Sequence, residues 1–251
     1  MKKLFLLILA ATFAVSTSAG AQTTATSNGV GRYDQKIEEQ ATGALNSKDK
    51  WKDITASTED GIVTLRGTTK LLIDKLDAAK KVRKLASVEG VRNQVVVESN
   101  ASDQQLQHKL ANKLRYDRVG YGNAFNFLAL DVKDGVVTVD GAVHDYPARD
   151  SAMGIVETTP GVKEAVNNIK VLPTSMLDDD IRLRVARAIY GNGVLAKYAT
   201  DPQKPIRIIV ENGHVTLYGV VDSKVDKQIA GMQANSVPDV FSVDDRLTVS
   251  K

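Results

Sequence analysis

Residues 134–141 read Asp-Gly-Val-Val-Thr-Val-Asp-Gly, and closely similar stretches stand at 60–67 and at 212–219. Each begins with Asp-Gly or Asn-Gly, pairs that favour a type I′ turn because both central residues must adopt positive φ. Apolar residues then alternate with outward-facing ones up to a glycine, so we predict a β-hairpin in each copy. The predicted turn glycines are Gly61, Gly135 and Gly213, and the glycines that end a strand or allow close packing are Gly67, Gly141 and Gly219.

A helix is predicted before each hairpin. Asp34, Asp103 and Asp178 are each followed by apolar residues three, seven and eleven positions later, which lie on one helical face. The aspartate suits the N-cap or first turn, where unpaired N–H groups and the helix dipole favour an anion. The acidic run 178–180 could also suggest a metal site, but its place directly before the periodic segment favours a helix start.

The strand before each turn and the helix after each hairpin follow the same spacing. The inward-facing residues of that strand are predicted to be Ile54, Ala56 and Thr58, then Leu128, Leu130 and Val132, then Ile206, Ile208 and Val210. The second helix carries an alanine eleven residues beyond the hairpin's last glycine, at Ala78, Ala152 and Ala230. Its apolar face in the first copy is predicted to be Leu72, Leu76, Ala79, Val82 and Leu85.

A turn and a last strand complete each copy. The turn is predicted at Glu89-Gly90, Pro160-Gly161 or Pro238-Asp239, and the strand ends at Val97, Val171 or Val249, thirty residues beyond the glycine. Two helices can cover only one face of a three-stranded sheet. The sequence therefore predicts an α+β fold of three tandem two-layer α-β-β-α-β units, each with two helices on a three-stranded mixed sheet.

The chain begins with features of an export signal. Lys2 and Lys3 precede an apolar run at 4–15, and Ala19-Gly20-Ala21 is typical of a cleavage site. We predict cleavage after Ala21 and a mature chain outside the cytoplasm, rather than an uncleaved anchor, because the run is shorter than the about 20 residues that span a bilayer. The predicted boundaries are signal peptide 1–21, flexible lead-in 22–32, and repeats 33–98, 102–172 and 177–250.

Composition removes several function classes. The chain has no cysteine, which excludes disulfides and zinc sites built on thiolates. Its formal net charge is +3, and loss of Lys2 and Lys3 with the signal leaves +1. A nearly neutral mature protein gives no electrostatic reason to expect a nucleic-acid partner. Because the linkers at 98–102 and 172–177 are short, we expect neighbouring units to touch, with sheet faces and edges open for docking.

The repeats resemble the BON domain (bacterial OsmY and nodulation domain), whose pattern is an Asp-led helix, a Gly-Val-x-Leu-x-Gly hairpin and a late Gly-Val. Residues 61–67 with Gly90-Val91 carry it in copy one, and 135–141 with Gly161-Val162 carry it in copy two. In copy three His214 interrupts the apolar pair and Pro238-Asp239 replaces the late glycine, and copy one is expected to have a longer second helix. The resemblance implies a periplasmic protein of osmotic or envelope stress that binds phospholipid surfaces or assists other envelope proteins, and it supplies no catalytic residues.

The sequence does not predict an enzyme. His108, His144 and His214 fall at unrelated points of the repeat, and no H-x-x-x-H spacing suggests a metal site. A nucleophile elbow, a P-loop and a dinucleotide fingerprint are all missing from the sequence. We therefore predict no catalytic residues, no metal and no cofactor.

Two features could carry binding. The second helix of copy one bears Lys75, Lys80, Lys81, Arg83 and Lys84, which could contact anionic lipid headgroups. The alternative is an ordinary solvated helix face, balanced by Asp74, Asp77 and Glu89. The second feature is a glycine-rich aromatic loop at 115–125, echoed at 190–193, with Tyr116, Tyr121, Phe125 and Tyr190 as candidate interface residues. These aromatic residues suit membrane insertion or partner docking, or else packing over their own sheet or the next unit.

These features support two functions. The first is a non-enzymatic periplasmic stress protein that binds phospholipid, with anionic membrane surfaces as the expected partner. The second is a chaperone-like or scaffolding protein that binds other exported envelope proteins through aromatic loops and open sheet faces. Salt discriminates between them, because screening weakens headgroup contacts more than aromatic docking.

Overall fold

The computed structural model describes residues 30–117, 124–200 and 205–250, without the side chains of Val30 and Tyr116. The predicted signal peptide, its cleavage site and Tyr121 lie outside the described residues. Helix α1 begins at Val30, so the last three residues of the predicted lead-in are helical.

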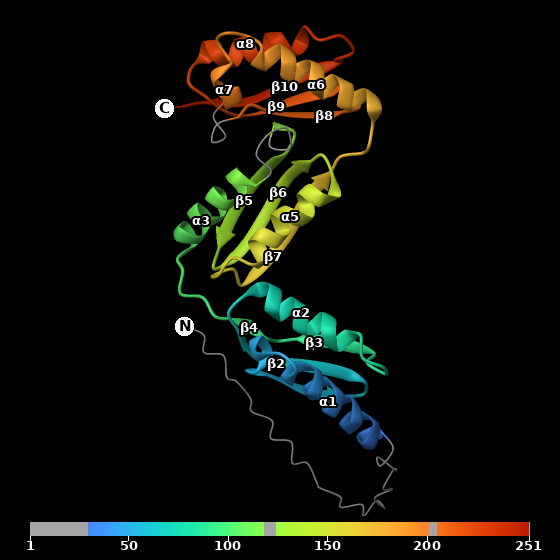
Figure 1. Cartoon of the computed structure of the whole chain (residues 1–251). Coiled ribbons are helices and arrows are strands. Elements are labelled where there is room, and N and C mark those ends of the chain that lie inside the picture. The colour runs from blue at the N-terminus through green and yellow to red at the C-terminus, as the bar shows by residue number, and fades with distance from the viewer. Residues whose placement is uncertain (1–29, 118–123, 201–204, 251) are drawn as a thin grey trace, which may run out of the picture.

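The chain forms three successive α/β units (Figure 1). The first contains α1 (Val30–Asn46), the 3-10 helix η1 (Asp49–Trp51), β1 (Ile54–Glu59), β2 (Ile62–Thr69), α2 (Leu72–Arg83), β3 (Gly90–Asn93) and β4 (Val96–Val97). The second contains α3 (Asp103–Tyr116), β5 (Phe127–Lys133), β6 (Val136–Val143), α5 (Tyr146–Glu157) and β7 (Glu164–Val171). The third contains α6 (Met176–Tyr190), α7 (Lys197–Thr200), β8 (Arg207–Glu211), β9 (His214–Val221), α8 (Lys224–Asn235) and β10 (Ser242–Val249).

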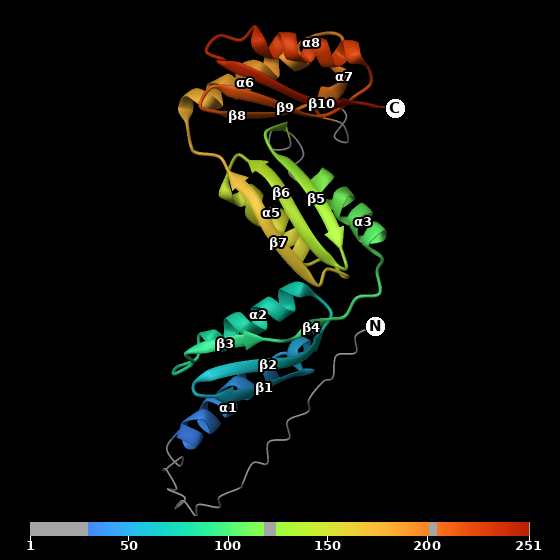
Figure 2. The same cartoon turned by 180° about the vertical axis from the view of Figure 1, so that it is seen from behind.

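All three sheets share one topology, which confirms the predicted fold class. The middle strand of each sheet (β2, β6 or β9) pairs antiparallel with the strand before it and parallel with the strand after it. The two long helices of each unit lie on one face of its sheet (Figures 1 and 2). In the first unit the last strand is interrupted, so that β3 and β4 both pair with β2.

The hairpin turns have the geometry that their sequence predicts. The φ values are 51° and 74° at Asp60 and Gly61, and the two equivalent turns also have positive φ at both central residues. The glycines at the far end of each hairpin lie inside the strand rather than at its end, because β2, β6 and β9 continue for two more residues. They allow close packing: a Cβ on Gly67 would lie 1.9 Å from the Asp53 carbonyl oxygen.

The leading aspartates hold the hairpin turns instead of capping their helices. Asp178 accepts hydrogen bonds from the N–H groups of Asn212 (2.9 Å) and Gly213 (2.8 Å). Asp34 and Asp103 bind the two turn N–H groups of their own units in the same way. Ser102 and Ser175 are the N-caps of α3 and α6, and Asp103 and Asp178 lie in the first turns, so of the two predicted places the first turn is correct for these two helices.

Apolar residues between helices and sheet form the cores. The inward-facing residues of the first strands lie against them, and Ala78, Ala152 and Ala230 are fully buried. Of the predicted apolar face of α2, Leu72 and Val82 are buried and Ala79 and Leu85 pack against the core, but Leu76 is exposed, which corrects the prediction for that residue.

Strand register corrects two details of the first copy. Gly90 pairs with Ile62 as Glu164 pairs with Val136, so the equivalent of Gly161-Val162 is Ser87-Val88 and not Gly90-Val91. Ser87 has the positive φ (70°) of this turn, which starts three residues earlier than predicted. The second helix has 12 residues in every unit, so the expected longer helix in copy one is wrong.

Candidate binding surfaces

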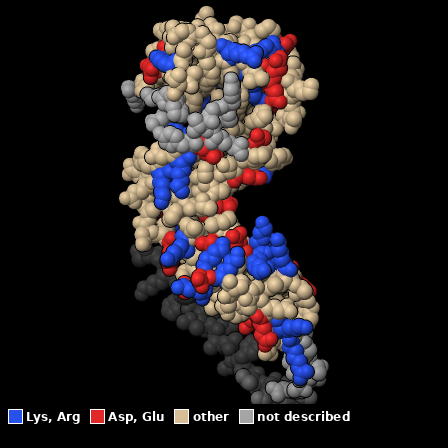
Figure 3. All heavy atoms as spheres, in the orientation of Figure 1, with Lys and Arg blue, Asp and Glu red and all other residues tan. Residues whose placement is uncertain are grey.

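The basic residues of α2 divide into two groups. Lys75 is half-buried and lies 3.9 Å from Glu164 of the second unit. The other four predicted contact residues are exposed at the C-terminal end of the helix, where cations also complement the helix dipole. Figure 3 shows lysine and arginine side chains gathered over the first unit where it borders the second. The four exposed residues at the C-terminal end of the helix are Lys80, Lys81, Arg83 and Lys84, and we name them the α2 basic end.

Two of the three acidic residues expected to balance this helix, Asp74 and Asp77, pair with another segment. Asp74 and Asp77 both pair with Lys50 of η1, at 2.8 and 3.0 Å. These two carboxylates also hold the pKa of the Lys50 ammonium above its ordinary value. The described residues therefore give the α2 basic end no ion-pair partner, and its charge faces solvent.

The predicted aromatic loop is described only in part. Phe125 packs against the apolar core of the third unit, so it contributes to the contact between two units. Tyr190, in contrast, packs within the third unit, to which it belongs, and its hydroxyl donates to the Ile206 carbonyl oxygen. Burial raises the pKa of this hydroxyl above its ordinary value, which is the behaviour of a structural tyrosine.

The junction of the second and third units brings together an aromatic pair that the sequence did not single out. The rings of Phe127 and Tyr218 are stacked with centroids 3.8 Å apart. Three polar contacts also join the two units: Lys170–Glu211 at 2.6 Å, His144–Asp179 at 3.0 Å, and Arg207 to the Asn126 carbonyl oxygen at 2.7 Å. In Figures 1 and 2 the helix-free face of the third sheet lies across the end of the second unit. Neighbouring units therefore touch here, as the short linkers suggested, and the helix-free face of the third sheet is contacted by the second unit.

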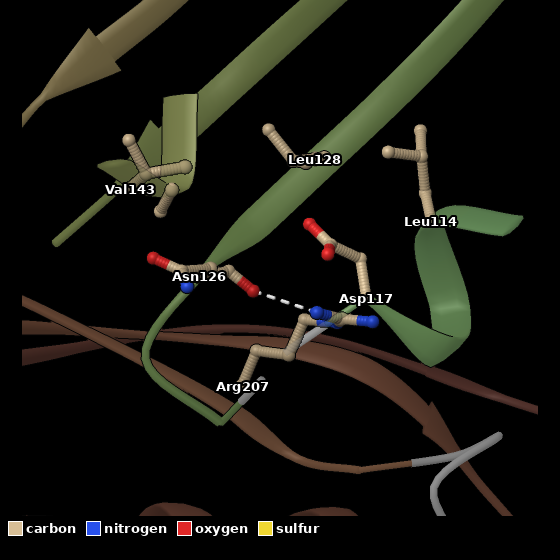
Figure 4. Close-up of a pocket in the computed structure, with 7 residues that line it drawn as sticks. Leu114, Asp117, Asn126, Leu128, Val143 and Arg207 are labelled. Atoms are coloured by element: carbon tan, nitrogen blue, oxygen red, sulfur yellow. Dashed lines mark hydrogen bonds between the residues drawn. The ribbon is translucent and has the colours of Figure 1, made fainter. Parts of the chain in front are cut away.

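A small cavity opens at this junction (Figure 4). It is lined by Leu114, Asp117, Asn126, Leu128, Val143, Ala148 and Arg207. Its volume of about 20 Å³ holds roughly one water molecule. Ser151 donates to both carboxylate oxygens of Asp117, at 3.0 and 2.9 Å, and burial lowers the pKa of the Arg207 guanidinium. The size and the internal hydrogen bonds indicate a structural site rather than a ligand pocket.

The histidines remain apart. His144 lies at the second junction, and the His214 ring nitrogen lies 2.7 Å from the Ser242 hydroxyl. Among the described residues no three histidine or acidic side chains come together in a way that could hold a metal ion. A helix long and apolar enough to cross a bilayer is also absent from the described part of the chain.

Comparison with known families places the chain in a class. Residues 33–99, 102–173 and 178–251 each match the model of the BON domain, so the chain belongs to the BON domain family. It is similar to osmotically-inducible protein Y of Escherichia coli strain K12, with 26% identity over 165 residues that cover 61% of this chain and 81% of that protein.

Solved structures of lower similarity also align with the chain. Two are of CdsD, described as the structural protein of the type III secretion system of Chlamydia trachomatis. They align with 86% and 85% of this chain and with 92% and 96% of theirs, at 12% and 11% identity and TM-scores of 0.25 and 0.24. Scores this low support no conclusion about fold or function.

Proposed function

We propose that the mature protein is a non-catalytic periplasmic protein of osmotic stress that binds anionic phospholipid surfaces through the α2 basic end. The observation that carries the lipid proposal is the group of four exposed cations without an acidic partner among the described residues. Each basic residue near an anionic surface contributes about 1 kcal/mol of attraction. The stress role rests on the similarity to osmotically-inducible protein Y, and the location on the predicted signal peptide.

The test is sedimentation of residues 22–251 with vesicles of phosphatidylcholine alone or with phosphatidylglycerol. We expect pelleting only with the anionic vesicles, and less of it as salt rises from about 50 mM to about 500 mM because the Debye length shortens. The triple variant Lys80→Glu, Lys81→Glu, Lys84→Glu should lose pelleting. No pelleting of the unaltered chain in any condition overturns the lipid proposal.

A matched control locates the contact on α2. Lys36, Lys52 and Lys70 are exposed in the same unit but belong to other segments. Reversal of these three charges changes the net charge by the same amount, and we expect the variant to pellet like the unaltered chain. Equal loss in both triple variants would show that overall charge, and not the α2 basic end, decides binding.

The second candidate function is the binding of exported polypeptides. Large apolar side chains are exposed on the third unit, with 86% of Met176, 70% of Met232 and 71% of Phe241 accessible to solvent. Exposed methionine and aromatic residues suit adaptable contacts with unfolded chains. Replacement of these three by serine should then abolish suppression of a denatured protein's aggregation without changing vesicle pelleting. Suppression that survives the replacement would argue against this surface.

A further inference from the structure

Each unit exposes two sheet edges, which poses a risk of mispairing. A strand edge with free N–H and C=O groups is a template for a further strand, and similar repeats in one chain are prone to misassembly. The three sheets here share topology and register, so their strands are suited to pair with one another. Each of the six edge strands therefore has outward-facing N–H and C=O groups to which another strand could pair.

The last strand of every unit carries a side chain that binds its own outer edge. This side chain accepts a hydrogen bond from the backbone N–H two residues later. The three contacts are Asn93 with Val95 (3.3 Å), Asn167 with Ile169 (3.0 Å) and Asp245 with Leu247 (3.0 Å). The residues occupy one register position, since they pair with Leu65, Val139 and Leu217 of the middle strands.

These N–H groups face away from the neighbouring strand. The Gln94 N–H bonds to the Leu65 carbonyl oxygen of β2 at 2.8 Å, and N–H directions alternate along a strand. The next N–H, that of Val95, therefore points to the outer edge, where Asn93 accepts its hydrogen bond. In the third unit Lys227 also donates to the Leu247 carbonyl oxygen at 2.6 Å, so both the N–H and the C=O of Leu247 are hydrogen-bonded.

In every unit a side chain of the first helix hydrogen-bonds a backbone group on the outer edge of the first strand. The residue four positions after the turn-holding aspartate reaches the outer edge in each case. Glu38 accepts from the Thr58 N–H (3.0 Å), Gln107 donates to the Leu130 carbonyl oxygen (3.3 Å), and Arg182 donates to the Val210 carbonyl oxygen (2.6 Å). The residue type matches the group that it binds: a carboxylate meets an N–H, and an amide or guanidinium meets a C=O.

We infer that these six side chains form edge caps that close both edges of each sheet against strand addition. The caps keep the repeats from pairing with one another and keep two copies of the chain from joining edge to edge. Partners of this protein then bind to helix and sheet faces and not to strand edges.

The test removes the caps of the last strands. The variant Asn93→Val, Asn167→Val, Asp245→Val keeps strand-forming residues but leaves three edge N–H groups free. We expect its mass, measured by light scattering during size exclusion, to rise at least twofold with increasing protein concentration. Amide exchange at Val95, Ile169 and Leu247 should also become faster in the dilute monomer.

A lysine variant separates edge closure from stability. Lysine at the same three positions also removes the hydrogen bonds but protects an edge by its charge. We expect this variant to keep the mass of the unaltered chain. Association of both variants, or a folded valine variant whose mass does not change, overturns the inference. If the triple valine variant does not fold, Asn167→Val alone serves, because Asn167 is exposed and lies outside the core.

Discussion

The two junctions of this chain join similar units by different physical means. The first and second units meet through helix α2, whose Leu72 is buried in the same apolar cluster as Leu106 and Leu110 of α3. The second and third units meet through the N-terminal end of β5 and the helix-free face of a sheet, with Phe125 against the third core, one aromatic stack and the exposed Lys170–Glu211 ion pair. Apolar burial is insensitive to salt, whereas exposed ion pairs are screened. The first junction should therefore hold in conditions that loosen the second.

The largest expected effect is at the first junction. Leu72 is 3% exposed, and Leu72→Ala should lower the free energy of unfolding by about 2–4 kcal/mol through lost burial and a cavity. Leu76→Ala is the matched control, because Leu76 lies one turn away on the same helix and is 40% exposed. Urea unfolding measures both variants. Equal effects would contradict an apolar junction centred on Leu72.

The aromatic stack should account for the next largest effect. A double-mutant cycle of Phe127→Ala and Tyr218→Ala should give a coupling energy of about 0.5–1.5 kcal/mol, since stacked rings contribute beyond their buried area. Thermal unfolding of the two single variants and the double variant supplies the cycle. Strict additivity would mean that the rings do not stabilise each other across the second junction.

The exposed ion pair at the second junction should contribute less. In Lys170→Ala and Glu211→Ala we expect losses of about 0–1 kcal/mol that disappear in about 1 M salt. Small-angle scattering of the unaltered chain should show a change in the arrangement of the third unit at high salt. An arrangement that is constant across the salt series would contradict the contrast between the junctions.

The smallest effect concerns pH at the first junction. Burial, with the neighbouring Asp77 charge, raises the pKa of Glu157 above its ordinary value of 4.5. A carboxyl whose folded pKa is raised contributes stability that is present below its unfolded pKa and is lost as pH rises through its folded pKa. Glu157→Gln should therefore be more stable than the unaltered chain at pH 7, and the difference should shrink toward pH 4. A stability difference between the two proteins that stays constant with pH would show that the titration of Glu157 does not affect folding stability.

The repeat could be predicted from the sequence because its signals are local. An Asn-Gly or Asp-Gly turn depends on the φ preferences of two residues, and a buried helix face depends on a short period. The late turn of copy one was placed three residues too far along the chain, because Gly90 resembled the family's glycine while Ser87 has the required φ. Leu76 is predicted in the core but is exposed, while Ala78 and Val82 further along the helix are buried, because periodicity alone does not fix which side of a helix faces its sheet.

The candidate surfaces could be predicted only as groups of residues. The sequence identified the basic residues of α2, but the pairing of Asp74 and Asp77 with Lys50 depends on residues brought together by folding. The stack of Phe127 on Tyr218 joins positions that have no local pattern in common. The edge caps do have a sequence signal, since Glu38, Gln107 and Arg182 follow an aspartate by four residues, but their different chemistry hides it.

By itself the sequence determined three hairpins, their flanking helices and the order of helices and strands along each unit, because turn chemistry and hydrophobic period act over a few residues. Only the tertiary structure decided how the units meet, which sheet face is covered and which backbone groups of the edges are bound. These features depend on distances between residues far apart in the chain. The hydrogen bond between Arg182 and Val210 can form only after helix α6 has packed on its sheet.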